Sequence, residues 1–396
     1  PPTLLAAGGL YLNSYRIIGR ALVMMLVVMA VMPFYFGLVP WLKGSPAVNR
    51  AVCSLTPDCA MQFAPDRNEP APGTEKLFSP EGVETEFPLV FMRDFYYDHS
   101  SGNLFTTYGP TCGFIRLDTH TGEMEVMKYR SLIRYLWSRD DLDYMLAPDW
   151  IYSGMITIDK ESFRIVARKP LEQEGLRVPM HLIEGGPHLY LLSTELPMLL
   201  RYDKKSLEPA GALNFKELGY TQYSHGAYAV ALDNMRRRAY VQLGTYDLAG
   251  RFRLLKIDME NFGVEADRWI YTGSTLMTAV PEKGGLLMYD YYGRRVTELD
   301  ADTLETRRVF DGVVNCRTTV YDPHRELLYM LGSGFGELAV IDYESGDTLG
   351  RWYMGNRAGS MYYSEEEDVL YAGSGEGIYR IHLETLTGRK IRSRSR

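Results

Sequence analysis

Cysteine, histidine and net positive charge are all scarce in this sequence. The chain of 396 residues has four cysteines, seven histidines and a net charge of −7. An acidic chain lacks the basic face that nucleic acid binds, so we expect no nucleic-acid partner. The cysteines show no CxxC spacing, and the histidines do not cluster, so we predict no metal site and no cofactor. No Asn-x-Ser/Thr sequon occurs either, so nothing indicates a glycosylated eukaryotic ectodomain.

One long apolar run lies near the start of the chain, between residues 21 and 42. It contains no charged residue and is long enough to cross a hydrocarbon core of about 30 Å as a helix. Tyr35 and Trp41 suit the membrane interface. The alternative is a signal peptide, cleaved near residues 45–47. We favour a retained anchor and predict an N-terminal segment (1–15), a transmembrane helix (16–43) and the lipid bilayer as a partner.

A proline-rich stretch, residues 44–82, follows the apolar run. Its six prolines interrupt any helix, so it is predicted to be a linker. Cys53 and Cys59 lie close together within it, and we predict a disulfide between them. Disulfides persist in oxidising compartments, so the rest of the chain is expected on the outer side of the membrane.

The last third of the chain contains a repeat. The pairs Leu328-Tyr329 and Leu370-Tyr371 lie 42 residues apart, each between a turn and a Gly-rich loop. A period of this length, filled with short alternating strands, is typical of β-propeller blades.

The same pattern recurs seven times from Val83 onward. The predicted second strands centre on Leu104-Phe105, Asp143-Tyr144, Leu189-Tyr190, Ala239-Tyr240, Leu287-Met288, Leu328-Tyr329 and Leu370-Tyr371. The predicted third strands end at Asp118, Asp159, Asp203, Asp258, Asp300, Asp342 and His382. We therefore predict an all-β fold, a seven-bladed β-propeller over residues 83–396.

A ring of blades must close, or its first and last blades leave open sheet edges. The N-terminal stretch 82–87 and the C-terminal stretch 387–393 compete for the position of the closing strand. We favour the N-terminal stretch.

The repeats resemble those of the YVTN/NHL-like group of bacterial propellers, which read Tyr-Val-x-Asn…Val-x-Val-Ile-Asp-x-x-Thr. The resemblance covers about residues 83–396, and the Asn of that pattern is missing here. It implies a fold and no activity. With the predicted anchor, it leads us to expect a single-pass protein of the bacterial inner membrane with a periplasmic propeller.

Basic residues recur where the innermost strands are predicted to begin. They are Arg93, Arg134, His181, His225, Arg317 and Arg357. Innermost strands line a propeller's central channel, so these residues are expected to form a cationic funnel for an acidic ligand or partner. The alternative pairs each base with a nearby acid such as Asp94.

Aromatic residues are predicted on the loops of the same face, among them Trp150 and Tyr291. Exposed Trp and Tyr are typical of protein contacts, and packing between blades is the alternative. The glycine-rich stretches 332–336 and 373–377 occupy the same position in two blades, so we interpret them as turns and predict no catalytic residues.

Two functions from different classes remain. The first is a non-catalytic scaffold or accessory subunit that docks on the periplasmic side of a larger membrane complex, with other membrane-protein subunits as partners. The alternative is a membrane-tethered enzyme of the lactonase, hydrolase or quinoprotein type, with its site at the channel mouth. We favour the scaffold, since propeller enzymes usually build their sites from acids and histidines of several blades.

Overall fold

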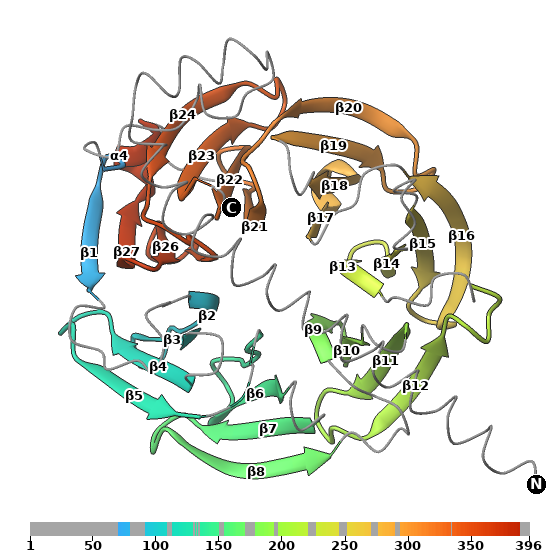
Figure 1. The fold of residues 1–396 in the computed structure, drawn as a ribbon, viewed down its shortest axis with the longest axis horizontal. Coiled ribbons are helices and arrows are strands. Elements are labelled where there is room, and N and C mark those ends of the chain that lie inside the picture. Colours follow the sequence, from blue (N-terminus) through green and yellow to red (C-terminus); the bar gives the residue numbers. More distant parts are fainter. Residues whose placement is uncertain are drawn as a thin grey trace, which may run out of the picture. The chain divides into compact units, whose positions relative to one another are not determined.

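The computed structural model describes only part of the chain. The described residues are 70–79, 92–108, 113–129, 131, 133, 135–149, 154–170, 179–193, 197–220, 227–244, 252–270, 276–289, 294–333 and 335–388. They belong to one compact unit, Pro65–Arg396. Within them, seven antiparallel sheets are arranged as the blades of a β-propeller, as the sequence predicts (Figure 1).

Blades 1 to 3 come first along the chain. Blade 1 consists of β2 (Met92–Asp98), β3 (Asn103–Tyr108), β4 (Gly113–Asp118) and β5 (Met124–Lys128). Blade 2 consists of β6 (Tyr144–Asp149), β7 (Gly154–Asp159) and β8 (Arg164–Pro170). Blade 3 consists of β9 (Pro179–Gly185), β10 (His188–Ser193), β11 (Met198–Asp203) and β12 (Pro209–Asn214).

Blades 4 to 6 repeat the four-stranded plan. Blade 4 consists of β13 (Ala227–Asp233), β14 (Arg238–Gly244), β15 (Phe252–Asp258) and β16 (Gly263–Ile270). Blade 5 consists of β17 (Met277–Val280), the short helix η3 (Pro281–Lys283), β18 (Gly285–Tyr289), β19 (Arg295–Asp300) and β20 (Thr306–Asp311). Blade 6 consists of β21 (Cys316–Asp322), β22 (Leu327–Gly332), β23 (Glu337–Asp342) and β24 (Thr348–Tyr353).

Blade 7 combines the two ends of the propeller. It consists of β25 (Ser360–Ser364), β26 (Val369–Ser374), β27 (Gly377–His382) and, as its outermost strand, β1 (Thr74–Phe78), and the helix α4 (Leu383–Thr387) follows β27. The N-terminal strand thus closes the ring, as favoured from the sequence. Its position was wrong, because the strand lies at 74–78, inside the stretch interpreted as linker, and residues 82–87 are outside the described part of the chain. Of the C-terminal rival, 387–393, the structure describes only Thr387, the last residue of α4, and Gly388 after it.

The third-strand aspartates predicted from the sequence are turn residues. Asp258, for example, accepts hydrogen bonds from the backbone N–H groups of Glu260 and Asn261, at 2.8 and 2.6 Å. Such bonds favour the charged carboxylate and lower the pKa of the equivalent Asp118 and Asp203. The pKa of Asp159 is lowered by the hydroxyl of Ser162 and then by its backbone N–H. The repeat of Asp at this position therefore has a local structural cause.

The residue pairs named as centres of the second strands are out of alignment with the other blades in blades 2 and 5. Phe105 pairs with Arg116, two residues before Asp118, and the residues with the equivalent pairing in blades 2 and 5 are Leu146 and Leu287. The sequence pattern had placed Tyr144 and Met288 there. A one- or two-residue offset is invisible in a strand that is apolar on both faces, because only strand pairing defines it.

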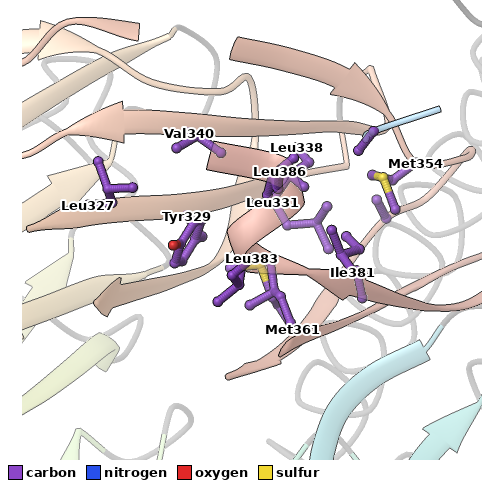
Figure 2. Close-up of a cluster of buried hydrophobic side chains, with 14 residues drawn as sticks. Leu327, Tyr329, Leu331, Leu338, Val340, Met354, Met361, Ile381, Leu383 and Leu386 are labelled. Atoms are coloured by element: carbon purple, nitrogen blue, oxygen red, sulfur yellow. The ribbon is translucent and has the colours of Figure 1, made fainter. Parts of the chain in front are cut away.

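The hydrophobic core is divided into seven clusters among the described residues, one between each pair of neighbouring blades. In the cluster between blades 6 and 7, Tyr329 and Leu331 of β22 meet Met361 of β25, and Leu383 and Leu386 of α4 join them (Figure 2). Burying such side chains contributes roughly 1.5–3 kcal/mol each, so the helix after β27 helps to hold the closing blade in place.

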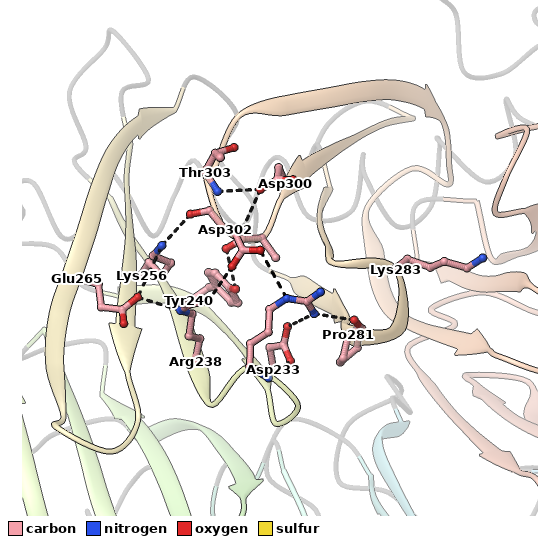
Figure 3. Close-up of polar contacts among 12 residues, drawn as sticks. Asp233, Arg238, Tyr240, Lys256, Glu265, Pro281, Lys283, Asp300, Asp302 and Thr303 are labelled. Carbon is pink, nitrogen blue, oxygen red and sulfur yellow. Dashed lines mark hydrogen bonds and ion pairs between the residues drawn. The ribbon is translucent and has the colours of Figure 1, made fainter.

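A polar contact also recurs between blades. A basic residue two positions before the end of the third strand donates hydrogen bonds to backbone carbonyls in a turn of the next blade. Examples are Arg116 with Lys160 (2.9 Å), Arg201 with Met259 (2.9 Å), Lys256 with Asp302 (2.7 Å) and Arg380 with Thr119 (2.5 Å). Figure 3 shows the contact between blades 4 and 5, where Tyr240 also donates to the carbonyl of Ala301 at 2.9 Å. The ring thus has apolar and polar contacts at the same boundaries.

The predicted transmembrane helix and the predicted Cys53–Cys59 disulfide lie outside the described residues. Among the helices that are described, none has the length and apolar character needed to cross a bilayer.

Candidate functional site

The innermost strands begin at one face of the propeller, here called the entry face. Where β2, β9, β13 and β21 pair with their second strands, the register shifts by one residue close to this face. Such β-bulges redirect a side chain from its place in the alternation. In β21 the extra residue is Arg317, and in β2 the bulge contains Arg93 and Asp94.

Three of the predicted basic residues lie on neighbouring blades at the entry face. Arg317 of blade 6 is exposed, and Arg357 before β25 of blade 7 and Arg93 of blade 1 are partly buried. Blade 7 stands between blades 6 and 1, because β25 contacts both β21 and β2. The structure therefore brings these arginines into one sector, here called the entry-face arginine sector (Arg93, Arg317 and Arg357).

The loops that carry two of these arginines are held by side chains. Asn315 and Ser333 form a hydrogen bond of 2.8 Å, and Ser333 accepts a bond of 3.1 Å from Nε of Arg317. In blade 7, the carboxylate of Glu376 accepts bonds from both the backbone and the side-chain amide of Asn356, at 3.0 and 3.1 Å. These contacts restrain the backbone next to Arg317 and Arg357.

The same loops contain unusual backbone conformations. Asn315 and Arg357 have φ angles of 53° and 59°. The other non-glycine residues with positive φ in the described part of the chain lie in hairpin turns on the opposite face. A left-handed arginine is uncommon and carries a conformational cost, so the surrounding contacts must hold it there. Burial also lowers the pKa of Arg357.

Of the other predicted site residues, one is buried and four lie outside the residues that the structure describes. His181 of β9 is buried, and its ring lies 4.7 Å from that of Tyr135. Arg134, His225, Trp150 and Tyr291 are not among the described residues. Residues 332–336 and 373–377 contain the turns between second and third strands, as interpreted from the sequence.

A buried ion-pair group near the entry face was missed by sequence reasoning. Glu337 at the start of β23 is fully buried and contacts Arg294 of blade 5 at 3.0 Å and Arg351 of blade 6 at 3.4 Å. Burial raises the pKa of Glu337, and the two guanidinium groups oppose this effect. Glu337 follows directly on the glycine-rich turn, and that turn was the only sequence signal near it. The group joins blades 5 and 6.

The opposite face, where first and second strands are joined, has an acidic turn in blade 7. Its four acids contact flanking blades, in the pairs Glu365–His324 (2.5 Å), Glu366–His99 (3.5 Å), Glu367–Tyr97 (2.5 Å) and Asp368–Arg325 (2.6 Å). The run of four acids is visible in the sequence, but the residues that contact it lie far away in the chain. These contacts are structural, since they dock the closing blade between blades 6 and 1.

Neither a metal site nor a reactive thiol emerges from the described residues. They contain no group of three His, Cys, Asp or Glu side chains placed to hold a metal ion. Cys316 is buried beside Thr319, and burial raises the pKa of its thiol to about 12. A thiol with such a pKa stays protonated at neutral pH.

Comparison with known proteins supports the fold alone. No protein-family profile and no curated protein matches the sequence, so the resemblance to YVTN/NHL-like repeats is not confirmed. A chain of hydrazine synthase from Kuenenia stuttgartiensis superimposes with a TM-score of 0.58 at 13% identity, covering 77% of this chain and 98% of that chain. A chain of the mitotic checkpoint complex gives a TM-score of 0.59 at 10% identity, covering 80% and 94%.

Proposed function

We propose that this protein is a non-catalytic, membrane-anchored accessory subunit, and that the entry-face arginine sector binds acidic groups of a partner subunit. The observation that carries the proposal is the position of three arginines on neighbouring blades at one face, where side-chain hydrogen bonds hold the segments next to Arg317 and Arg357. Guanidinium groups bind carboxylates through charge-assisted bonds, and a site that is ordered in advance loses less entropy on binding.

Two features of the sequence support the membrane-anchored part of the proposal. The uncharged run between residues 21 and 42 favours an anchor, and the pair Cys53 and Cys59 favours an oxidising compartment, which would be the periplasm of a bacterium. The propeller fold is also shared with a chain of a mitotic checkpoint complex. A fold alone does not define a function, so the proposal depends on the arginine sector.

The first prediction tests the arginine sector by substitution. We expect Arg317→Ala combined with Arg357→Ala to reduce the recovery of partner subunits at least about tenfold, because each charge-assisted bond contributes roughly 1.5–3 kcal/mol. The measurement is quantitative mass spectrometry of proteins that co-purify from native membranes in mild detergent. Thermal stability should change little, since partly exposed arginines contribute little to folding.

The matched control is Arg237→Ala with Arg164→Ala, which removes two exposed arginines from a turn of the opposite face and from the outer strand β8. This variant should recover partners as the unchanged protein does. Equal losses in both double variants would indicate a general charge effect. If instead the unfolding temperature falls while the recovery of partner subunits is unchanged, the entry-face arginines stabilise the fold and do not bind a partner.

A further inference from the structure

Two buried tyrosines meet at the acidic turn of blade 7. Tyr97 of β2 and Tyr371 of β26 belong to blades 1 and 7, and their exposed fractions are 1% and 0%. Their rings stack with centroids 5.0 Å apart and planes inclined by 29°. Both hydroxyl groups donate to one carboxylate, Tyr97 to Oε1 of Glu367 at 2.5 Å and Tyr371 to Oε2 at 2.7 Å. Two stacked phenols therefore share one proton acceptor.

Tyrosines at the equivalent position of other second strands have a different environment. Tyr240 of blade 4 donates to a backbone carbonyl of blade 5 at 2.9 Å, and a carbonyl is a weak base. Tyr329 of blade 6 donates to Asp322 at 3.0 Å, but that carboxylate also forms an ion pair with Arg325. Among the described residues, by contrast, the two phenols are the only hydrogen-bond donors to the side chain of Glu367. Its carboxylate is therefore a base reserved for phenolic protons.

Two further aromatic rings connect this site with the protein surface. The ring centroid of Tyr97 lies 4.9 Å from that of His99 and 6.1 Å from that of Tyr362. His99 and Tyr362 are partly exposed, and Nε2 of His99 lies 3.3 Å from the hydroxyl of Tyr362. Electron transfer between rings at such separations is fast, because its rate falls steeply only over longer distances. The buried pair is thus accessible to an oxidant at the opposite face.

We propose that Tyr97 and Tyr371 form a redox-active tyrosine site, which gives one electron to a one-electron oxidant at the opposite face. The oxidant takes the electron from the stacked pair, the O–H bond of one phenol breaks, and its proton passes along the hydrogen bond to Glu367. The products are a neutral tyrosyl radical, a protonated carboxyl group and the oxidant reduced by one electron. This site does not depend on the arginine sector binding a partner.

The shared carboxylate supplies what phenol oxidation requires. A phenol that loses an electron becomes a very strong acid, so oxidation is easiest where a base already accepts its hydrogen bond. Burial, and then the bond to Glu367, raises the pKa of both Tyr97 and Tyr371, so both phenols hold their protons at neutral pH. Proton and electron must therefore leave together. Burial also protects the radical, because few reactants in solution reach either ring.

The test is photochemical oxidation of the whole protein by tris(bipyridine)ruthenium(III), a one-electron oxidant generated by a light flash. We expect a tyrosyl radical in electron paramagnetic resonance spectra, formed more slowly in D2O than in H2O because a proton moves with the electron. The double variant Tyr97→Phe with Tyr371→Phe should lose most of this signal. Glu367→Gln should lose it as well, since an amide accepts a hydrogen bond but takes no proton. Tyr240→Phe, at a buried tyrosine of blade 4, is the matched control and should keep the signal.

Equal radical yields in the unchanged protein and the double variant would overturn the proposal, because the radical would then lie on other tyrosines. An undiminished yield in Glu367→Gln would contradict the carboxylate's role as proton acceptor and overturn it too. If these variants do not fold, peptide mapping of the unchanged protein after oxidation decides. Oxidised or cross-linked Tyr97 or Tyr371 supports the site, whereas oxidation confined to exposed tyrosines rules it out.

Discussion

Asp300 closes the turn between β19 and β20 by accepting hydrogen bonds from the backbone N–H groups of Asp302 and Thr303, at 2.9 and 2.7 Å. The guanidinium of Arg307 approaches the same carboxylate at 2.6 Å. The Thr303 bond and these neighbours lower the pKa of Asp300 to about 2, although partial burial opposes them. The turn is therefore built for the charged form of the residue.

A stability measurement against pH tests this role. Because the pKa of Asp300 is lower in the folded state, its charge stabilises the fold above about pH 4, and this contribution disappears as pH falls toward 2. Asp300→Asn should thus be less stable than the unchanged protein at pH 6 and equally stable near pH 2. Urea unfolding over this range measures the difference. A difference independent of pH would show that the charge is unimportant.

At the scale of secondary-structure elements, β1 has the most consequential position. It pairs with β27 from Thr74–Ile381 onward, and Glu75 contacts Arg380 at 3.3 Å across the pair. Leu77 and Phe78 also pack against the cluster between blades 7 and 1. Without β1, β27 would present an unpaired edge, and such edges promote aggregation.

Truncation before and after this strand tests its role. A chain that begins at Pro65 retains β1, and a chain that begins at Pro80 lacks it. We expect the shorter chain to unfold at a lower temperature and to aggregate at micromolar concentration, whereas the longer one stays monodisperse. Thermal unfolding and light scattering measure both properties. Equal behaviour of the two chains would contradict a closing role for β1.

At the scale of the whole propeller, the described residues of each blade contact those of its two neighbours, through one hydrophobic cluster and polar contacts on each side. Leu331 is fully buried in the cluster between blades 6 and 7. Arg201 joins blades 3 and 4 through the carbonyl of Met259 and stacks on Phe262, with its guanidinium carbon 4.4 Å from the ring centroid. These two boundaries share no residue.

We therefore predict that substitutions at these two blade boundaries lower the unfolding free energy additively. Leu331→Ala should cost about 2–5 kcal/mol of unfolding free energy by leaving a cavity, and Arg201→Met about 1–3 kcal/mol by leaving a carbonyl unsatisfied. The double variant should equal their sum within about 0.5 kcal/mol in denaturant unfolding. Leu349→Ala, at a side chain that is 46% exposed, is the matched control and should change little. A double variant that deviates from this sum by more than about 0.5 kcal/mol would indicate energetic coupling between the two boundaries.

Part of the candidate site could be predicted from the sequence. The positions of Arg93, Arg317 and Arg357 near the start of innermost strands follow from the repeat, because the repeat defines where each strand begins. Their grouping into one sector follows from blade order. The bulges and left-handed residues that orient them could not be predicted, because strand pairing and loop contacts produce them.

The sequence by itself determined the number of blades and the aspartates at the ends of the third strands, because alternation and turn chemistry depend on residues close together in the chain. It favoured the N-terminal stretch for ring closure and left the C-terminal stretch as the alternative. The tertiary structure alone decided that the closing strand is 74–78, since it pairs with residues about 300 positions away, as Glu75 and Arg380 do at a separation of 305. It also decided the alignment of the second strands in blades 2 and 5 and the hydrogen bond between Tyr97 and Glu367. Contacts between distant segments select one arrangement among several that satisfy the same local pattern, and no local signal in the sequence encodes that selection.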